Sequence, residues 1–346
     1  MTAIRVLICE DSLAYAAGLQ RMLEYDKDIS VAGVRVSAEA AVTALPRLRP
    51  DLVTMDIELP GMDGIRAVEE IMGSRPLPIL VISAYVAGAA SEKAAAALAV
   101  GALDAVAKDD LDLGDPAGAA GVAFRRRVRT LSRARVIRHP RSGPGPGLDV
   151  RDPGRRASAI GVCASTGGPQ VVARLLDALP VDFPIPLLIV QHIGAGFVAG
   201  FASWLDQTVR LPVAIARGGS PAGRGAWIAP DGAHLKLTSA GLLALDRHTV
   251  TGHHRPSGDV LLESIAAAAG RAGVAIVLSG MGADGAAGAA AVRGKGGLAM
   301  AQDQESSAVF GMPKVAIDLG VDLVLSPAEI AAALVNLSHE PLAAVR

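Results

Sequence analysis

Aromatic residues are scarce in this sequence of 346 residues, at 3% of the chain. Proteins that bind single-stranded nucleic acid stack bases on aromatic rings, so the composition argues against such a surface. An excess of one charge is also lacking, because 33 basic residues nearly balance 34 acidic ones and leave a formal net charge of −1. The overall charge therefore favours neither nucleic acid nor an anionic membrane as a partner.

Cysteine is nearly absent, since the chain has only Cys9 and Cys163, each within an apolar run. Two buried, reduced thiols fit a cytoplasmic protein better than a secreted one held by disulfides. No run of about 20 apolar residues occurs, so we expect no membrane insertion. Residues 1–10 lack the charged and apolar regions of a signal peptide and are typical of a strand. We therefore expect a cytoplasmic location.

Short apolar runs that alternate with helical patterns dominate what the sequence does contain. Strands that alternate with helices form parallel sheets covered on both faces. Together with the length, this rhythm predicts an α/β protein with two doubly wound parallel-sheet domains. The predicted strands are residues 4–9, 52–57, 79–83, 105–107, 159–163, 187–191 and 274–278, and the predicted helices include residues 12–25 and 91–100.

Residues 139–156 are rich in proline, glycine and arginine. Such a composition cannot bury a core, so this segment is predicted to be an interdomain linker. We accordingly predict a first domain over residues 1–120, a helix extension and linker over residues 121–157, and a second domain over residues 158–346.

The helix extension carries a cluster of arginines. Asp115 and Pro116 are typical of a helix start, and we predict a helix from there to about residue 136. A nucleic-acid patch is one interpretation of the cluster, but a solvated or domain-facing helix surface is the one we favour. The arginines are Arg125, Arg126, Arg127, Arg129, Arg133 and Arg135.

Polar side chains follow the predicted strands of the first domain. Glu10 and Asp11 come directly after one strand, and Asp56 lies at the end of another. Strand carboxyl ends meet at one edge of a parallel sheet, and clustered carboxylates favour a bound Mg²⁺. Ser83 and Lys108 also lie at strand ends, where a hydroxyl and an ammonium group would meet a phosphoryl oxygen.

These five residues resemble the site of the receiver domains of bacterial response regulators. The resemblance covers about the first 120 residues and implies a flavodoxin-like fold. It implies that Asp56 is the phosphoacceptor, that Glu10 and Asp11 hold Mg²⁺ with it, and that Ser83 and Lys108 contact the phosphoryl group. A histidine kinase is the implied phosphodonor.

Two positions depart from the receiver pattern. Ala105 replaces an aromatic residue three positions before the lysine, and Asp109 replaces the proline that follows it. The alanine removes the side chain that normally changes rotamer on phosphorylation. The departure therefore concerns how the signal is read out rather than the phosphorylation chemistry.

A nucleophile candidate lies in the second domain. The strand at residues 159–163 runs into Ala-Ser-Thr-Gly-Gly-Pro at residues 164–169, and a helix is predicted to begin near Pro169. A strand, a turn of small residues and a helix start would hold Ser165 at the edge of the sheet beside backbone N–H groups. The alternative is a phosphate-binding loop, although the G-x-G-x-x-G pattern is missing.

A serine nucleophile needs a base and an orienting carboxylate. His192 follows the strand at residues 187–191, and Asp284 lies in a glycine-rich turn after the strand at residues 274–278. His192 would take the proton of Ser165, and Asp284 would fix its tautomer. Backbone N–H groups of the turn at residues 280–282, or those after Ser165, would form the oxyanion hole.

The second domain closely resembles the CheB family of chemotaxis protein-glutamate methylesterases. The resemblance implies a Rossmann-like methylesterase domain with Ser165 as nucleophile, His192 as base, Asp284 as orienter and the Met281 backbone as oxyanion donor. The segments that carry it are residues 164–169, 191–192, 228–235, 255–260, 279–285, 302–303 and 311–313.

The same resemblance implies an activity and its control. The substrates are methyl esters on glutamate residues of chemoreceptor cytoplasmic domains, and the family also deamidates receptor glutamines. The receiver is expected to cover the active site until Asp56 is phosphorylated. Hydrolysis needs no cofactor in this scheme.

Other interpretations stay open beside this one. A signalling module that binds partners through its receiver would keep the fold with only residual hydrolysis, and a DNA-binding regulator would need a helix-turn-helix that the sequence does not show. The histidines of the second domain lack the spacing of a zinc site. Arg255 and Ser257 either line the substrate cleft or belong to a helix start.

Overall fold

The computed structural model describes most of the chain, namely residues 3–84, 89–136, 156–249 and 254–338. It forms two compact units, one of Met1–Arg138 with Ile193–Phe201 and one of His139–His192 with Ala202–Arg346. The predicted linker, residues 139–156, lies almost wholly outside the described residues, and the predicted domain boundaries stay a prediction.

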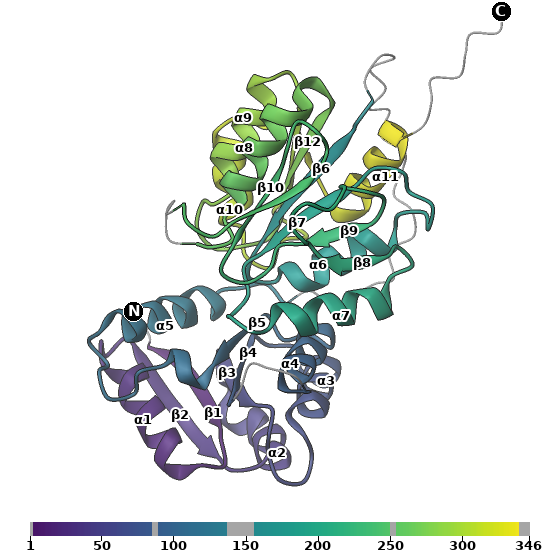
Figure 1. Ribbon diagram of the computed structural model, residues 1–346. Coiled ribbons are helices and arrows are strands. Elements are labelled where there is room, and N and C mark those ends of the chain that lie inside the picture. The colour runs from purple at the N-terminus through teal and green to yellow at the C-terminus, as the bar shows by residue number, and fades with distance from the viewer. Residues whose placement is uncertain (1–2, 85–88, 137–155, 250–253, 339–346) are drawn as a thin grey trace, which may run out of the picture. The chain divides into compact units, whose positions relative to one another are not determined.

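The first unit alternates strands and helices along the chain. Its strands form one sheet of five in the order β2-β1-β3-β4-β5, with every neighbouring pair parallel. Helices α1 and α5 cover one face of the sheet, and α2, α3 and α4 cover the other (Figure 1). The elements are β1 (Ile4–Cys9), α1 (Leu13–Glu24), β2 (Ile29–Arg35), α2 (Ala38–Leu48), β3 (Leu52–Asp56), α3 (Gly64–Ser74), β4 (Ile79–Ser83), α4 (Ala89–Ala99), β5 (Asp104–Ala107), the 3₁₀ turn η1 (Lys108–Asp110) and α5 (Ala119–Leu131).

This strand order is the flavodoxin-like one, and it places a topological switch point beside β1. The chain moves from β1 to β2 on one side and then crosses back to β3 on the other. The two crossover connections therefore leave a crevice at the carboxyl ends of β1 and β3. Glu10 and Asp56 are at those ends.

Local sequence explains why these elements form where they do. Strands β3, β4 and β5 are buried along their whole length, as expected for a sheet covered on both faces. Helix α1 begins after Ser12, whose hydroxyl accepts a hydrogen bond from the backbone N–H of Tyr15. Its buried residues, which include Leu19 and Met22, recur at helical spacing.

The start of α5 differs from the prediction. The helix begins at Ala119 after Gly118, not at Asp115 and Pro116, and it ends at Leu131 rather than near residue 136. Asp115 instead closes a separate turn, because its carboxylate and its carbonyl both accept from the N–H of Gly118. The Asp-Pro pair thus shapes a turn one step before the helix.

The arginine cluster is solvated only in part, since Arg126, Arg133 and Arg135 are exposed and the other three form ion pairs. Arg125 is only 2% exposed and pairs with Asp26 at 2.7 Å. Arg129 pairs with both Asp26 and Asp28, and Arg127 lies 3.3 Å from a carboxylate oxygen of Asp104. Much of the positive charge of this helix is therefore matched by acidic residues of the same unit.

The second unit is built on a parallel sheet of seven strands, in the order β14-β13-β12-β6-β7-β9-β8. Helices α8, α9 and α10 lie on one side of this sheet, and α6 and α11 lie on the other (Figure 1). Helix α7 is divided between the two units, because its residues Val198–Phe201 belong to the first. The elements are β6 (Ala159–Ala164), α6 (Gly168–Asp177), β7 (Leu187–Gln191), α7 (Val198–Thr208), β8 (Val213–Ile215), β9 (Ala226–Ile228), β10 (His234–Leu237), β11 (Leu243–Asp246), α8 (Gly258–Ala269), the 3₁₀ turn η2 (Gly270–Ala272), β12 (Gly273–Val277), α9 (Ala286–Gly294), β13 (Leu298–Gln302), α10 (Met312–Asp318), β14 (Leu323–Leu325) and α11 (Pro327–Ser338).

The first strand of this unit, β6, lies in the middle of the sheet, between β7 and β12. The chain leaves β6 toward β7 on one side and returns later to β12 on the other, so the switch point falls at the carboxyl end of β6. The antiparallel hairpin of β10 and β11 is a separate sheet of two strands. Both cysteines are free and buried, as predicted.

Within the described ranges, no helix combines the length and the apolar content that crossing a bilayer requires.

Candidate functional site

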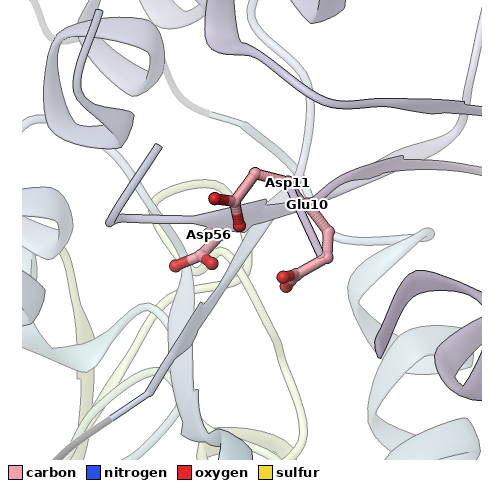
Figure 2. A group of neighbouring side chains, drawn as sticks. All are labelled: Glu10, Asp11 and Asp56. Atoms are coloured by element: carbon pink, nitrogen blue, oxygen red, sulfur yellow. The ribbon is translucent and has the colours of Figure 1, made fainter. Parts of the chain in front are cut away.

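The switch point of the first unit gathers three carboxylates. Glu10 and Asp56 are each 2% exposed, whereas Asp11 is exposed. Carboxylate oxygens of the three residues lie within 4.8 Å of one another (Figure 2). Opposite ligands of one Mg²⁺ are about 4.2 Å apart, so small side-chain rotations would bring these oxygens onto a single ion. The donor set is of the kind that Mg²⁺ prefers.

Lys108 supplies the positive charge of this cluster. Its Nζ lies 2.7 Å from Oε2 of Glu10 and 2.7 Å from Oδ2 of Asp56. Oδ1 of Asp56 accepts a hydrogen bond from the backbone N–H of Glu58 at 3.0 Å. The ammonium group also lies 4.6 Å from the ring centroid of Tyr15, a cation–π contact that further fixes the lysine.

Burial and ion pairing act in opposite directions on these groups. Burial lowers the pKa of Lys108, but its contacts with Asp56 and Glu10 outweigh this and leave that pKa raised. Burial raises the pKa of Glu10, and the hydrogen bond from Lys108 only partly opposes the rise. The lysine thus stays charged, while the Glu10 carboxylate lacks full compensation, which a bound cation would provide.

Two further receiver positions are as the sequence predicts. Ser83 ends β4 and is buried, and its hydroxyl has no hydrogen-bond partner among the described residues. Ala105 is fully buried in β5, so a methyl group occupies the position of the missing aromatic side chain. An unpaired buried hydroxyl at a strand end is suited to bind an incoming oxygen acceptor.

The second site begins with Ser165, one residue past β6. Its backbone N–H donates to the carbonyl of Ser279 at 3.0 Å, and its carbonyl accepts from Gly168 at 2.8 Å. Between them, Gly167 has a φ of 73°, a left-handed conformation that glycine adopts without strain. This turn leads directly into α6, so Ser165 lies at a helix N-terminus as expected.

His192 follows β7, the neighbour of β6. The strand register pairs Ala164 with Gln191, and the N–H of His192 donates to the carbonyl of Ala164 at 2.8 Å. Ser165 and His192 are therefore the residues that directly follow a pair of register partners on adjacent strands. The ring of His192 also stacks on that of His254, with centroids 4.2 Å apart and planes 14° from parallel.

Asp284 lies beside the imidazole. Its Oδ2 is 2.8 Å from Nε2 of His192. This contact does not have the geometry of a hydrogen bond, since neither ring nitrogen of His192 forms a hydrogen bond with any described residue. The histidine and the carboxylate are thus together at ion-pair distance, whereas the bond to Ser165 is not formed. Catalytic hydrogen bonds often tighten only when substrate is bound.

The start of α8 fixes the carboxylate of Asp284. Ser257 donates its hydroxyl to Oδ1 at 2.8 Å, and the N–H groups of Gly258 and Asp259 donate at 2.6 and 3.0 Å. Burial raises the pKa of Asp284, but the contacts with His192 and with these donors dominate and hold that pKa well below its usual range. Asp284 therefore stays ionised beside the imidazole.

Ser257 has the helix-start role, one of the two between which the sequence left a choice, and the substrate-cleft role stays a prediction. It is the N-cap of α8, where its hydroxyl accepts from the N–H of Val260 at 3.4 Å, and it also donates to Asp284. The backbone N–H of Ser257 in turn donates to Nδ1 of His234, which is buried. His234 is therefore engaged in supporting the helix start.

The turn after β12 packs against Ser165. A Cβ built on Gly280 would lie 2.7 Å from Cβ of Ser165, so only glycine fits there. The N–H of Gly280 donates to the carbonyl of Val309 at 3.0 Å, which removes it from the possible oxyanion donors. Met281, the expected donor, is the next residue of this turn.

Together, a phosphoacceptor-type acidic pocket and a serine-histidine-aspartate set at the strand ends of a second α/β unit define a receiver-linked hydrolase. A family model of the response regulator receiver domain matches residues 6–113, and a model of the CheB methylesterase matches residues 160–334. The chain belongs to the CheB methylesterase family, and the predicted fold class is confirmed.

Several known proteins resemble the chain over most of its length. It is 42% identical to protein-glutamate methylesterase/protein-glutamine glutaminase 2 of Anaeromyxobacter dehalogenans, over 97% of both chains. It is 40% identical to the corresponding protein 3 of Myxococcus xanthus, over 94% of this chain and 92% of the relative. The crystal structure of the Thermotoga maritima CheB methylesterase catalytic domain superposes with a TM-score of 0.51 at 36% identity, covering 52% of this chain and 98% of that one.

Proposed function

We propose that the chain is a protein-glutamate methylesterase and protein-glutamine deamidase of bacterial chemotaxis. It acts in the cytoplasm on the cytoplasmic domains of methylated chemoreceptors, and phosphorylation of Asp56 controls it. The observation that carries the catalytic assignment is the 2.8 Å approach of Asp284 to His192, at strand ends adjacent to that of Ser165.

The hydrolysis follows from these three side chains. The hydroxyl oxygen of Ser165 attacks the ester carbonyl of a methylated glutamate, and His192 takes the hydroxyl proton. The tetrahedral intermediate collapses to an acyl-serine, and His192 gives the proton to the departing methanol. Water then attacks the acyl group, with His192 again as base, and releases glutamate and free serine. A glutamine substrate loses ammonia in place of methanol.

The orientation of His192 assigns its nitrogens. Because Asp284 faces Nε2, the neutral imidazole keeps its proton on that nitrogen, and Nδ1 is the atom that accepts the serine proton. The imidazolium formed in this step is stabilised by a carboxylate whose low pKa keeps it charged. The Met281 N–H is the proposed oxyanion donor, in the turn that packs against Ser165.

The receiver supplies the control. A carboxylate oxygen of Asp56 attacks the phosphorus of a phosphohistidine in the donor kinase, and the phosphorus–nitrogen bond breaks. Glu10, Asp11 and Asp56 would hold Mg²⁺, which when bound neutralises charge between the carboxylate and the phosphoryl group. Lys108 and Ser83 would then bind phosphoryl oxygens.

Methanol release from a methylated receptor tests the proposal. Ser165→Ala should abolish release, and a wild-type rate in that variant would refute the catalytic assignment. A phosphodonor should raise the rate of the intact wild-type chain but not that of Asp56→Ala. If wild type releases no methanol with or without the donor, the chain is a signalling module rather than a methylesterase.

A further inference from the structure

Gln191 occupies the last position of β7 and is 3% exposed. The register pairs it with Ala164, the last residue of β6, and the N–H of His192 donates to the carbonyl of Ala164. That bond is the final backbone rung between the two strands. Beyond it, the backbones that carry Ser165 and His192 have no further rung to hold them at a fixed separation.

The side chain of Gln191 forms hydrogen bonds that take the place of a further backbone hydrogen bond between the two strands. Its amide nitrogen donates to the carbonyl of Ser165 at 2.8 Å and to the carbonyl of His192 at 2.9 Å. An amide NH₂ carries two protons, so one group can serve both acceptors at once. The carbonyl of Ser165 also accepts from the N–H of Gly168, which ties the same point to the start of α6.

The other end of the amide makes no such contact. Oε1 of Gln191 is buried and has no hydrogen-bond partner among the described residues. It packs against the backbone of Gly168, where an added Cβ would lie 2.3 Å from it. An orphaned buried acceptor costs free energy, and an apolar side chain of the same length would avoid that cost.

We infer that Gln191 is a positioning residue of the esterase, which sets the distance between the nucleophile and its base by holding the carbonyls of Ser165 and His192 with one amide. The inference rests on the proposed roles of these two residues. Gln191 touches neither the substrate nor the reacting atoms, and it acts only through the two backbones that it joins.

Gln191→Met in the full-length chain tests the inference, because methionine keeps the length of the side chain and removes the donor. Two rates should fall together by about 10- to 100-fold, the scale of a misplaced reacting group. They are kcat for methanol release and the rate at which a small fluorophosphonate modifies Ser165, a reaction that needs no receptor binding. KM for the receptor should stay unchanged.

Ile189→Val is the matched control. Ile189 lies two residues earlier on β7, with its side chain on the same face as that of Gln191, and is fully buried. Its register partner on β6 is Val162, two residues before Ala164. This variant should keep the wild-type kcat even though it removes a buried methyl group.

Gln191→Glu gives a second readout if methionine impairs folding. A protonated glutamic acid still donates to one of the two carbonyls, whereas a carboxylate repels both. The kcat of this variant should therefore show an additional fall with rising pH that wild type lacks. A pH profile identical to that of wild type would overturn the positioning role.

The outcomes separate this inference from the proposed function. If Ser165→Ala is inactive and Gln191→Met keeps both wild-type rates, only the positioning role is wrong. It is also wrong if the lost activity merely tracks the fraction of protein that is unfolded. If Ser165→Ala itself retains turnover, the proposed function fails and the role of Gln191 with it.

Discussion

Replacing Asp284 with asparagine tests the anchoring of His192 with an almost isosteric change. The carboxylate accepts from Ser257 and Asp259 through Oδ1 and from Gly258 through Oδ2, which also faces His192. An amide offers one acceptor oxygen and one donor nitrogen. If the oxygen keeps the Oδ1 position, the NH₂ group meets the N–H of Gly258 and Nε2 of His192.

This mismatch should lower both the stability of the variant and its kcat. The buried N–H of Gly258 loses its acceptor, which should lower the free energy of unfolding by about 1–3 kcal/mol. Nε2 of His192 must now accept from the amide, so the imidazole proton moves to Nδ1, the nitrogen that has to receive the proton of Ser165. A base in the wrong tautomer costs about 10⁴-fold in kcat in comparable triads.

The sequence makes the two effects separately measurable. Methanol release from methylated receptor gives kcat. The chain has two tryptophans, Trp204 and Trp227. Trp227 lies on β9 within the second unit, so tryptophan fluorescence of a Trp204→Phe background during urea denaturation follows that unit. Wild type and Asp284→Asn should differ in both measurements at neutral pH.

The pH dependence has a definite sign. The pKa of Asp284 is lower in the folded protein than in the unfolded chain, so its ionised form stabilises the fold above the unfolded pKa of about 3.9. That stabilisation is lost as the pH falls through the folded pKa. The stability difference between wild type and Asp284→Asn should be constant near neutrality and shrink below about pH 4.

Two results would refute this reasoning. A variant that turns over at the wild-type rate would show that Asp284 does not orient His192. A stability difference that persists unchanged below pH 3 would show that the loss does not come from the ionised carboxylate.

Gly280→Ala should lower kcat by about 10- to 100-fold, because the added Cβ would lie 2.7 Å from that of Ser165. In the control Gly294→Ala the added Cβ meets nothing within 4 Å, so methanol release should be unchanged. An equal loss of kcat in both variants would contradict the packing argument. Arg125→Ala removes a buried guanidinium that donates to the carbonyls of Met22 and Pro116. It should destabilise the first unit by about 1–3 kcal/mol in calorimetry, and an unchanged transition would show that these bonds contribute nothing. Asp56→Asn should abolish phosphoryl incorporation from a small acyl phosphate, and labelling at the wild-type level would exclude Asp56 as the acceptor.

Apolar runs located seven strands within about one residue, because a strand buried on both faces is apolar along its whole length, although β13 is also buried throughout and was missed. The prediction at residues 79–83 coincides with β4, and that at residues 187–191 coincides with β7. Strand β2 was not predicted, since only its first residue, Ile29, is buried and the others are partly exposed. Its sequence therefore lacks the continuous apolar pattern that identified the others.

The candidate site was predictable as far as strand ends determine it. Chain order and parallel topology suffice to bring Ser165 and His192 to one edge of a sheet. They do not give the contacts of side chains from distant segments. The bond from Ser257 to Asp284 and the stacking of His254 on His192 depend on where the tertiary fold places residues 254–257, directly before α8. No local pattern encodes that path.

Both units place their chemistry at a switch point, yet they treat their key carboxylates in opposite ways. Asp284 receives two backbone N–H groups and a hydroxyl from the start of α8, fixed donors that cannot leave. Asp56 receives one backbone N–H and the ammonium group of the Lys108 side chain. A carboxylate that must stay charged beside an imidazolium benefits from permanent dipoles, because they need no rearrangement during turnover. If Asp56 attacks phosphorus as proposed, a side-chain partner has the advantage that it can turn to the phosphoryl oxygens once the new bond has formed.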